Sequence, residues 1–170
     1  MPRTAQRVPV GGRGARRDVT GTEVVGMLNG FYGTYTPRMD DKGRVTLPAR
    51  YRDSFAAGAM LVRGQDHCLF VFTPEGFEKF AAAAIEASIT DERARGFQRY
   101  MLANTDEQRP DAQGRISITP RMREYAGLTK DLVITGIGLR MEIWDAAQWA
   151  AYEARQEAAY AVPERGLLDS

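Results

Sequence analysis

The chain has 170 residues, 44% of them apolar, and its 23 Lys and Arg residues nearly balance 22 Asp and Glu residues. A single Cys and a single His exclude a disulfide framework and leave zinc and haem sites poorly supplied, and no apolar run reaches the roughly 18 residues of a membrane span. We therefore expect a soluble cytoplasmic protein of one domain or two small halves, with no metal, no cofactor and no membrane partner.

The first 29 residues differ in composition from the rest of the chain. They carry five arginines against two carboxylates and have neither helical nor strand periodicity. Two interpretations stay open: a disordered basic tail that can reach DNA, or an artefact of start-site choice, with translation beginning at Met27. The rest of the chain has 18 basic and 20 acidic residues, so a surface that binds an anion has to concentrate its positive charge.

An internal repeat organises the remaining sequence. The run DDKGRVTLP at residues 40–48 returns 71 positions later as DAQGRISITP at residues 111–120. Each copy predicts a tight turn, because Asp bonds its own backbone and Gly adopts positive φ without strain. Alternating apolar residues then predict a short half-buried strand, and the proline begins a short helix, for which Thr119 is the expected N-cap in the second copy.

The elements that follow are similar in the two halves. Short apolar runs predict strands at 60–63 and 68–72 in the first half, and at 132–137 and 141–144 in the second. Start signals and apolar residues at helical spacing predict three longer helices, one after Thr73, one capped by Thr90 and running toward Asn104, and one after Asp145. This order of β-rich unit, helices, β-rich unit and helix predicts an α+β fold.

The domain organisation follows from these elements. We expect a tail or start-site artefact at 1–29, a first repeat at 30–77, a helical connection at 78–104, a second repeat at 105–148, and a C-terminal helix and tail at 149–170. A half of roughly 50 ordered residues buries too little surface to be stable alone, so the two should interlock around one core. The apolar residues of the helices belong either to this core, which we expect, or to a contact with a neighbouring subunit.

Positive charge is concentrated in the two repeated segments. Residues 38–52 and 109–123 each have a net charge of +3, in a chain whose net charge is +1. Such patches suit nucleic acid, because basic turns contact phosphates and arginine forks onto guanine O6 and N7. The alternative is that the Asp-x-x-x-Arg pairs of the two turns are ion pairs that only stabilise them. Both interpretations hold together if each aspartate orients an arginine that contacts DNA.

The residues from Gly33 to Arg52, together with DAQGR at 111–115, closely resemble the MraZ family of bacterial transcriptional regulators. The likeness extends over about residues 31–155 and includes the repeat spacing and the Glu-Ile-Trp run at 142–144. It implies a β-rich, pseudo-symmetric double swapped-hairpin barrel of the AbrB type, built from two internal repeats with flanking helices. It also implies a homo-oligomer, a ring of protomers, that binds double-stranded DNA.

The resemblance further implies where such a protein binds and what it does there. Members bind short G-rich direct repeats in the promoter of their own gene, and they usually repress the gene cluster for cell division and wall synthesis. A nucleoid-associated autorepressor is therefore the function that the family likeness implies.

Carried over position by position, the resemblance implies a set of site residues. The expected DNA contacts are, in falling order, Arg44, then Lys42 and Arg115, then Gln113. Weaker candidates, which either contact phosphate or are simply solvated, are Arg38, Arg109, Arg50 and Arg52. The expected positioning residues are Asp40, Asp111, Gly43 and Gly114. The aspartates belong to the second group because a carboxylate that faced phosphates would be repelled.

Two rival interpretations bear on function. An enzyme is disfavoured because Gly136-Ile137-Gly138 lacks the rest of a phosphate loop, His67-Cys68 suits a buried thiol beside a surface imidazole, and Asp145 suits a solvated charge. No catalytic residue and no small-molecule substrate is expected. The second rival, an oligomeric protein-interaction or nucleoid-binding scaffold without operator specificity, stays open.

Overall fold

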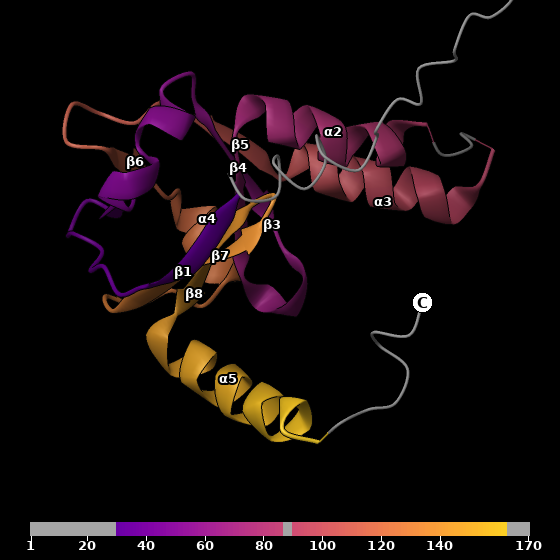
Figure 1. Ribbon diagram of the computed structural model, residues 1–170. Helices are drawn as coiled ribbons and strands as arrows, with labels where there is room; N and C mark the ends of the chain where they lie inside the picture. The colour runs from indigo at the N-terminus through magenta and orange to yellow at the C-terminus, as the bar shows by residue number, and fades with distance from the viewer. Residues whose placement is uncertain (1–29, 87–89, 163–170) are drawn as a thin grey trace, which may run out of the picture.

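The computed structural model describes residues 30–86 and 90–162, so the expected tail at 1–29 and the chain end at 163–170 lie outside the described residues. Within the described part the chain forms eight strands and four α-helices (Figure 1). The strands are β1 (Phe31–Tyr35), β2 (Arg44–Thr46), β3 (Ala59–Arg63), β4 (Leu69–Phe72), β5 (Thr105–Gln108), β6 (Arg115–Ser117), β7 (Leu132–Gly138) and β8 (Met141–Asp145). The helices are α2 (Pro74–Ile85), α3 (Glu92–Ala103), α4 (Pro120–Tyr125) and α5 (Ala146–Tyr160). The α+β class expected from the sequence is confirmed.

The two repeats interlock in one six-stranded antiparallel sheet. Its order is β1–β7–β8–β4–β3–β5, so the first strand of each repeat pairs with a strand of the other repeat. β4 and β8, the last strands of the two repeats, pair with each other in the middle. Each repeat therefore supplies hydrogen-bonding partners that the other lacks, as expected for halves too small to be stable alone.

The strands of the repeated motif, β2 and β6, form a separate two-stranded antiparallel ladder. Val45 lies opposite Ile116 in its register, and both side chains are buried. Because successive side chains of a strand point to opposite faces, Arg44 and Arg115 project from the other face of the ladder. One face of this ladder is thus part of the core, and the other carries both motif arginines.

The six-stranded sheet has an apolar cluster on each face, as alternation along its strands requires. One cluster joins the sheet to the β2–β6 ladder and includes Leu61, Val71, Ile134 and Ile143 of the sheet with Leu47 and Ile118 beside the ladder. The other lies between the sheet and α2, α3 and α5, and includes Val62, Phe72, Val133 and Trp144. The ladder is therefore held on the side of the sheet opposite the long helices.

The closed barrel implied by the family likeness is not formed. β1 and β5 are the two edges of the six-stranded sheet, and the β2–β6 ladder does not bridge them. The motif strands are three residues long and form their ladder hydrogen bonds with each other. No strand is then left to close the sheet within the described residues.

Several local expectations need correction. Asp91, rather than Thr90, caps α3, because its Oδ1 accepts from two backbone N–H groups of the first turn at 2.8 and 3.4 Å. Thr119 occupies the N-cap position of α4, but its hydroxyl donates to Asp106 at 2.9 Å and caps nothing. Asp145 caps α5 and is 5% exposed, so it is not a solvated charge.

Two further elements differ from the expectation. Pro48 precedes a 3₁₀ turn at Ala49–Tyr51 instead of beginning an α-helix. β5 was not expected, because its sequence TDEQ has no apolar alternation; pairing with β3 makes it a strand.

The apolar residues of α2 and α3 are only partly in the core. Ala81 and Met101 are buried, whereas Ile85, Phe97 and Tyr100 are 57%, 51% and 51% exposed. The expectation that these residues are core therefore holds for one side of each helix. Among the described residues, no helix is both long and apolar enough to cross a membrane.

Candidate nucleic-acid interface

Asp40 organises the first motif turn with both carboxylate oxygens. Oδ1 accepts from the backbone N–H of Lys42 at 3.0 Å and of Arg44 at 2.9 Å, while Oδ2 accepts from Arg44 Nε at 2.8 Å. The Gly43 N–H closes the turn on the Asp40 carbonyl at 3.0 Å. Gly43 has a φ of 74°, in the left-handed region where a Cβ is strained. The order of Asp, Gly and Arg in the motif is thus the order that this turn requires.

The second motif turn repeats this geometry atom for atom. Oδ1 of Asp111 accepts from the backbone N–H of Gln113 and of Arg115, each at 2.9 Å, and Oδ2 accepts from Arg115 Nε at 2.7 Å. Gly114 closes it with a φ of 75°. Both ion pairs expected from the sequence are therefore present.

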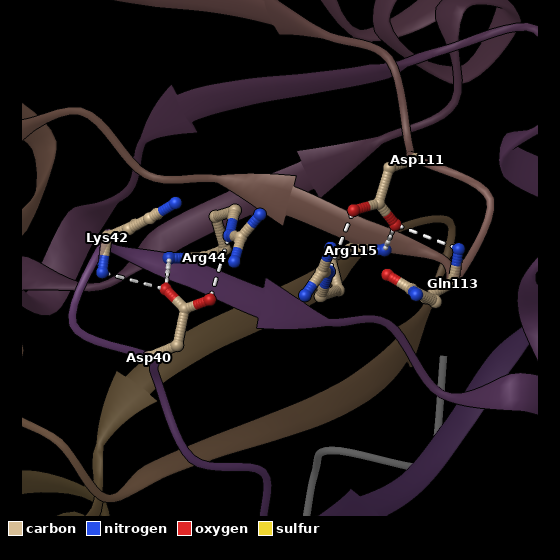
Figure 2. A network of polar contacts seen from close by, with 6 residues as sticks. All are labelled: Asp40, Lys42, Arg44, Asp111, Gln113 and Arg115. Atoms are coloured by element: carbon tan, nitrogen blue, oxygen red, sulfur yellow. Dashed lines mark hydrogen bonds and ion pairs between the residues drawn. The ribbon is translucent and has the colours of Figure 1, made fainter.

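The ion pairs orient the arginines without occupying the ends of their side chains. Each aspartate binds its arginine at Nε, and in the described part of the chain the terminal nitrogens of Arg44 and Arg115 have no further partner. Those nitrogens form the fork that fits a phosphate or the edge of a guanine. Figure 2 shows both arginine side chains over one face of the β2–β6 ladder, between the two turns. With side chains 29% and 28% exposed, they are held but accessible.

Each turn is also bound to the backbone of the opposite repeat. The N–H of Ile118, which follows β6, donates to the Gly43 carbonyl at 2.8 Å. The N–H of Leu47, which follows β2, donates to the Gly114 carbonyl at 2.9 Å. The two turns are therefore fixed relative to each other through the ladder and do not move as independent loops.

An arginine of the opposite repeat covers each turn glycine. A Cβ built on Gly43 would lie 3.0 Å from Cζ of Arg123, and one built on Gly114 would lie 2.5 Å from Nε of Arg52. Both glycines are buried under these side chains. Arg52 was a weak sequence candidate and Arg123 was not one; the basic residues after each proline were the only signal for this arrangement.

The remaining candidates lie in different settings. Lys42 and Gln113 are exposed on the two turns. Arg38 forms a surface ion pair with Asp131 at 2.9 Å. Arg109 is exposed, and its side chain forms no ion pair within the described residues. The structure thus groups eight of the expected residues, namely the two aspartates, the two glycines, the two arginines, Lys42 and Gln113, in the two turns of one ladder.

The turn hydrogen bonds also determine the protonation of the aspartates. Donation from the backbone N–H of Arg44, followed by its side chain, lowers the pKa of Asp40 below the ordinary value of 3.8. The equivalent bonds from Arg115 lower the pKa of Asp111. Both carboxylates are therefore ionised at neutral pH, the form that holds the arginines.

The other pair of potentially reactive residues, His67-Cys68, is arranged as expected, with a buried thiol beside a surface imidazole. Cys68 is 1% exposed, burial raises the pKa of its thiol, and His67 is exposed. Over residues 30–86 and 90–162, no three His, Cys, Asp or Glu side chains gather as metal ligands.

Comparisons with known proteins agree on one family. A family model described as "MraZ protein, putative antitoxin-like" matches the chain twice, at residues 31–100 and 101–169. A protein of Saccharopolyspora erythraea named "Transcriptional regulator MraZ" is 52% identical over 138 residues, which cover 81% of this chain and 96% of that protein. Proteins of the same name from Corynebacterium glutamicum and Mycolicibacterium smegmatis are each 50% identical, over 81% and 75% of this chain and 96% and 89% of their own.

The turn geometry predicts that an alanine at either turn glycine destabilises the fold. We expect Gly43→Ala and Gly114→Ala each to lower the free energy of unfolding by about 1–2 kcal/mol, because φ is positive and the new methyl group meets an arginine. Gly96→Ala is the control, since nothing lies within 4 Å of its Cβ position on α3, and it should raise stability by about 0.5–1 kcal/mol. Denaturant unfolding measures all three; unchanged stability of both turn variants would contradict this geometry.

The lowered pKa values predict how the turns respond to acid. Because the folded-state pKa of Asp40 and Asp111 lies below that of the unfolded chain, their contribution to stability is complete above the ordinary value of 3.8 and is lost as pH falls through the folded value. Carbon NMR titration of the two carboxyl groups should give midpoints below 3.8. In Arg44→Ala the titration midpoint of Asp40 should rise, while that of Asp111 should stay unchanged. An Asp40 midpoint that is the same in Arg44→Ala and in the parent protein would contradict the pairing of Asp40 with Arg44.

Proposed function

The chain belongs to the MraZ family, and from this premise we propose that it is a sequence-specific DNA-binding transcriptional regulator. We propose further that it represses its own gene by binding short G-rich direct repeats upstream of it, in the gene cluster for cell division and wall synthesis. The observation that carries the proposal is the β2–β6 ladder, which holds two oriented arginines with free guanidinium ends on one face.

A two-stranded ribbon of this kind suits the major groove of DNA. The groove is about 12 Å wide and admits an antiparallel β-ribbon, and each base pair presents a distinct pattern of donors and acceptors there. Arg44 and Arg115 lie diagonally across the ladder, so their Cα atoms are roughly 7–8 Å apart. Two guanidinium forks from one ribbon can therefore meet neighbouring guanines, which fits G-rich repeats.

The surrounding residues suit supporting roles. Asp40 and Asp111 hold the arginines by Nε, so that less side-chain entropy is lost when DNA binds. Lys42 and Gln113, exposed on the turns, can bond phosphate or a base edge. Arg38 and Arg109 are exposed arginines that suit phosphate contacts, which add affinity without sequence preference.

The finer architecture is proposed on the same premise. The interlocked strand order supports two AbrB-like swapped-hairpin repeats at 30–77 and 105–148, joined by the helical segment 78–104. A ring of protomers would set several ladders against successive DNA repeats. Later contacts then become intramolecular, which can raise avidity about 10²-fold or more when the spacing matches.

Binding to a duplex from upstream of the protein's own gene, compared with a scrambled duplex at near-physiological salt, tests the proposal. A preference of about 10³-fold or more is expected of a specific regulator. Equal binding to both would instead support a nucleoid-binding scaffold, and binding to neither would support a protein partner; both results overturn operator recognition.

The same assay tests the site. Arg44→Ala should lose most of the preference for the promoter duplex, because each bidentate contact contributes about 1–3 kcal/mol of discrimination and every protomer on the DNA loses one, while light scattering finds the oligomer unchanged. Arg155→Ala on α5 is the control and should bind as the parent does. Undiminished promoter binding by Arg44→Ala would show that the ladder is not the DNA contact.

A further inference from the structure

A cavity of about 390 Å³ lies away from the motif turns. Residues of β3, β4, α2, α3 and α4 line it, together with the turn between β7 and β8, so both repeats contribute. Its walls are largely aromatic and include Phe70, Phe80, Phe97, Tyr100 and Tyr125. The volume lies at the lower end of the range, roughly 300–1,000 Å³, of pockets that hold small organic ligands.

Two arginines line this cavity, and only one has its charge balanced. Arg140 donates to Glu142 at 2.8 Å and lies 3.9 Å from the centre of the Phe70 ring. Arg63 has no ion pair in the described part of the chain. A guanidinium in an aromatic wall without a carboxylate beside it favours the arrival of an anion.

The contacts of Arg63 leave hydrogen-bonding capacity unused. Its guanidinium lies 4.8 Å from the centre of the Tyr125 ring, and Nη1 donates to the Tyr100 hydroxyl at 3.3 Å. Its Nε is buried and has no partner. Because the Nε is buried, only the terminal nitrogens of this guanidinium can reach a ligand, and in the described part of the chain the Tyr100 hydroxyl is their one hydrogen-bond partner.

The rings around this arginine define the rest of the ligand. Aromatic walls favour a flat apolar body, which stacks on ring faces or meets ring edges. The terminal nitrogens of Arg63, which have no carboxylate partner in the described part of the chain, favour an oxyanion, which can accept two N–H groups at once. We propose that this cavity binds a small organic anion with a flat aromatic body of one or two rings, whose carboxylate or phosphate oxygens accept from Arg63.

Titration of the full-length protein with defined probes tests the proposal. The two anionic probes are salicylate and adenosine 5′-monophosphate, which carry a carboxylate and a phosphate, and their uncharged counterparts are salicylamide and adenosine. Calorimetry should find that at least one anion binds about 10-fold or more tightly than its uncharged counterpart, as expected for a charge-assisted hydrogen bond. The anion that binds identifies the acid group. The ¹⁵N resonance of Arg63 Nε should shift with it.

Paired variants locate the binding. Arg63→Gln should weaken the anion about 10- to 100-fold. Arg155→Gln is the matched control, because that guanidinium also lies near a tyrosine ring, 5.8 Å from the centre of Tyr152, but lines no part of this cavity; it should bind as the parent does. If Arg63→Gln does not fold, Tyr100→Ala replaces it, since that side chain is 51% exposed and its loss should still weaken binding several-fold.

Three results would overturn the proposal. The first is that no probe binds the parent protein. The second is that the Arg63 and Arg155 variants bind equally well. The third is that Arg63→Gln changes the mass of the oligomer in light scattering while no probe binds, which would make the cavity a contact between copies of this chain. None of these results depends on DNA binding.

Discussion

Strand pairing between the two repeats is the constraint on which the rest of the structure depends. Among the described residues, β1 and β5 have their only sheet partners in the opposite repeat, and β2 and β6 pair with each other. Because each motif strand is three residues long, the ladder is stable only as part of the shared core beneath it. The two DNA-contacting turns that we propose are therefore one rigid unit, a consequence of how two halves too small to fold alone complete each other.

The same interlocking explains which features could be predicted from the sequence. The turns at Asp40 and Asp111 depend on hydrogen bonds within five residues, so the motif alone predicted them correctly. β5 could not be predicted, because its sequence is polar and only pairing with β3 makes it a strand. Likewise, nothing local indicates that Arg123 covers Gly43, a contact across 80 positions of the chain. The sequence of each motif therefore predicts its turn, whereas the strands and side chains that pack against the turns depend on contacts between distant parts of the chain.

The charges of the chain also act through specific pairs of side chains. Each motif segment carries a net charge of +3 within a nearly neutral protein. Within each segment, the negatively charged aspartate fixes the orientation of the arginine by accepting from its Nε. By binding Nε, the carboxylate directs the guanidinium and leaves its fork free. At the cavity, Glu142 accepts from both Nε and Nη2 of Arg140, at 3.2 and 2.8 Å, whereas Arg63 forms no ion pair in the described part of the chain. Arginine thus occurs in two settings: in the ladder an aspartate orients it, and at the cavity Arg63 lies among aromatic rings without an ion pair in the described part of the chain.

We propose that the arginines of the β2–β6 ladder contact guanines in the major groove. Methylation interference on the promoter duplex tests it most directly, because methylation of guanine N7 blocks the acceptor to which an arginine fork binds. We predict that N7 methylation within the repeats prevents binding of the parent protein, and that the interference is weakened at specific guanines in Arg44→Ala. Binding that tolerates N7 methylation throughout the repeats, but is lost when adenine N3 in the minor groove is methylated, would contradict the account.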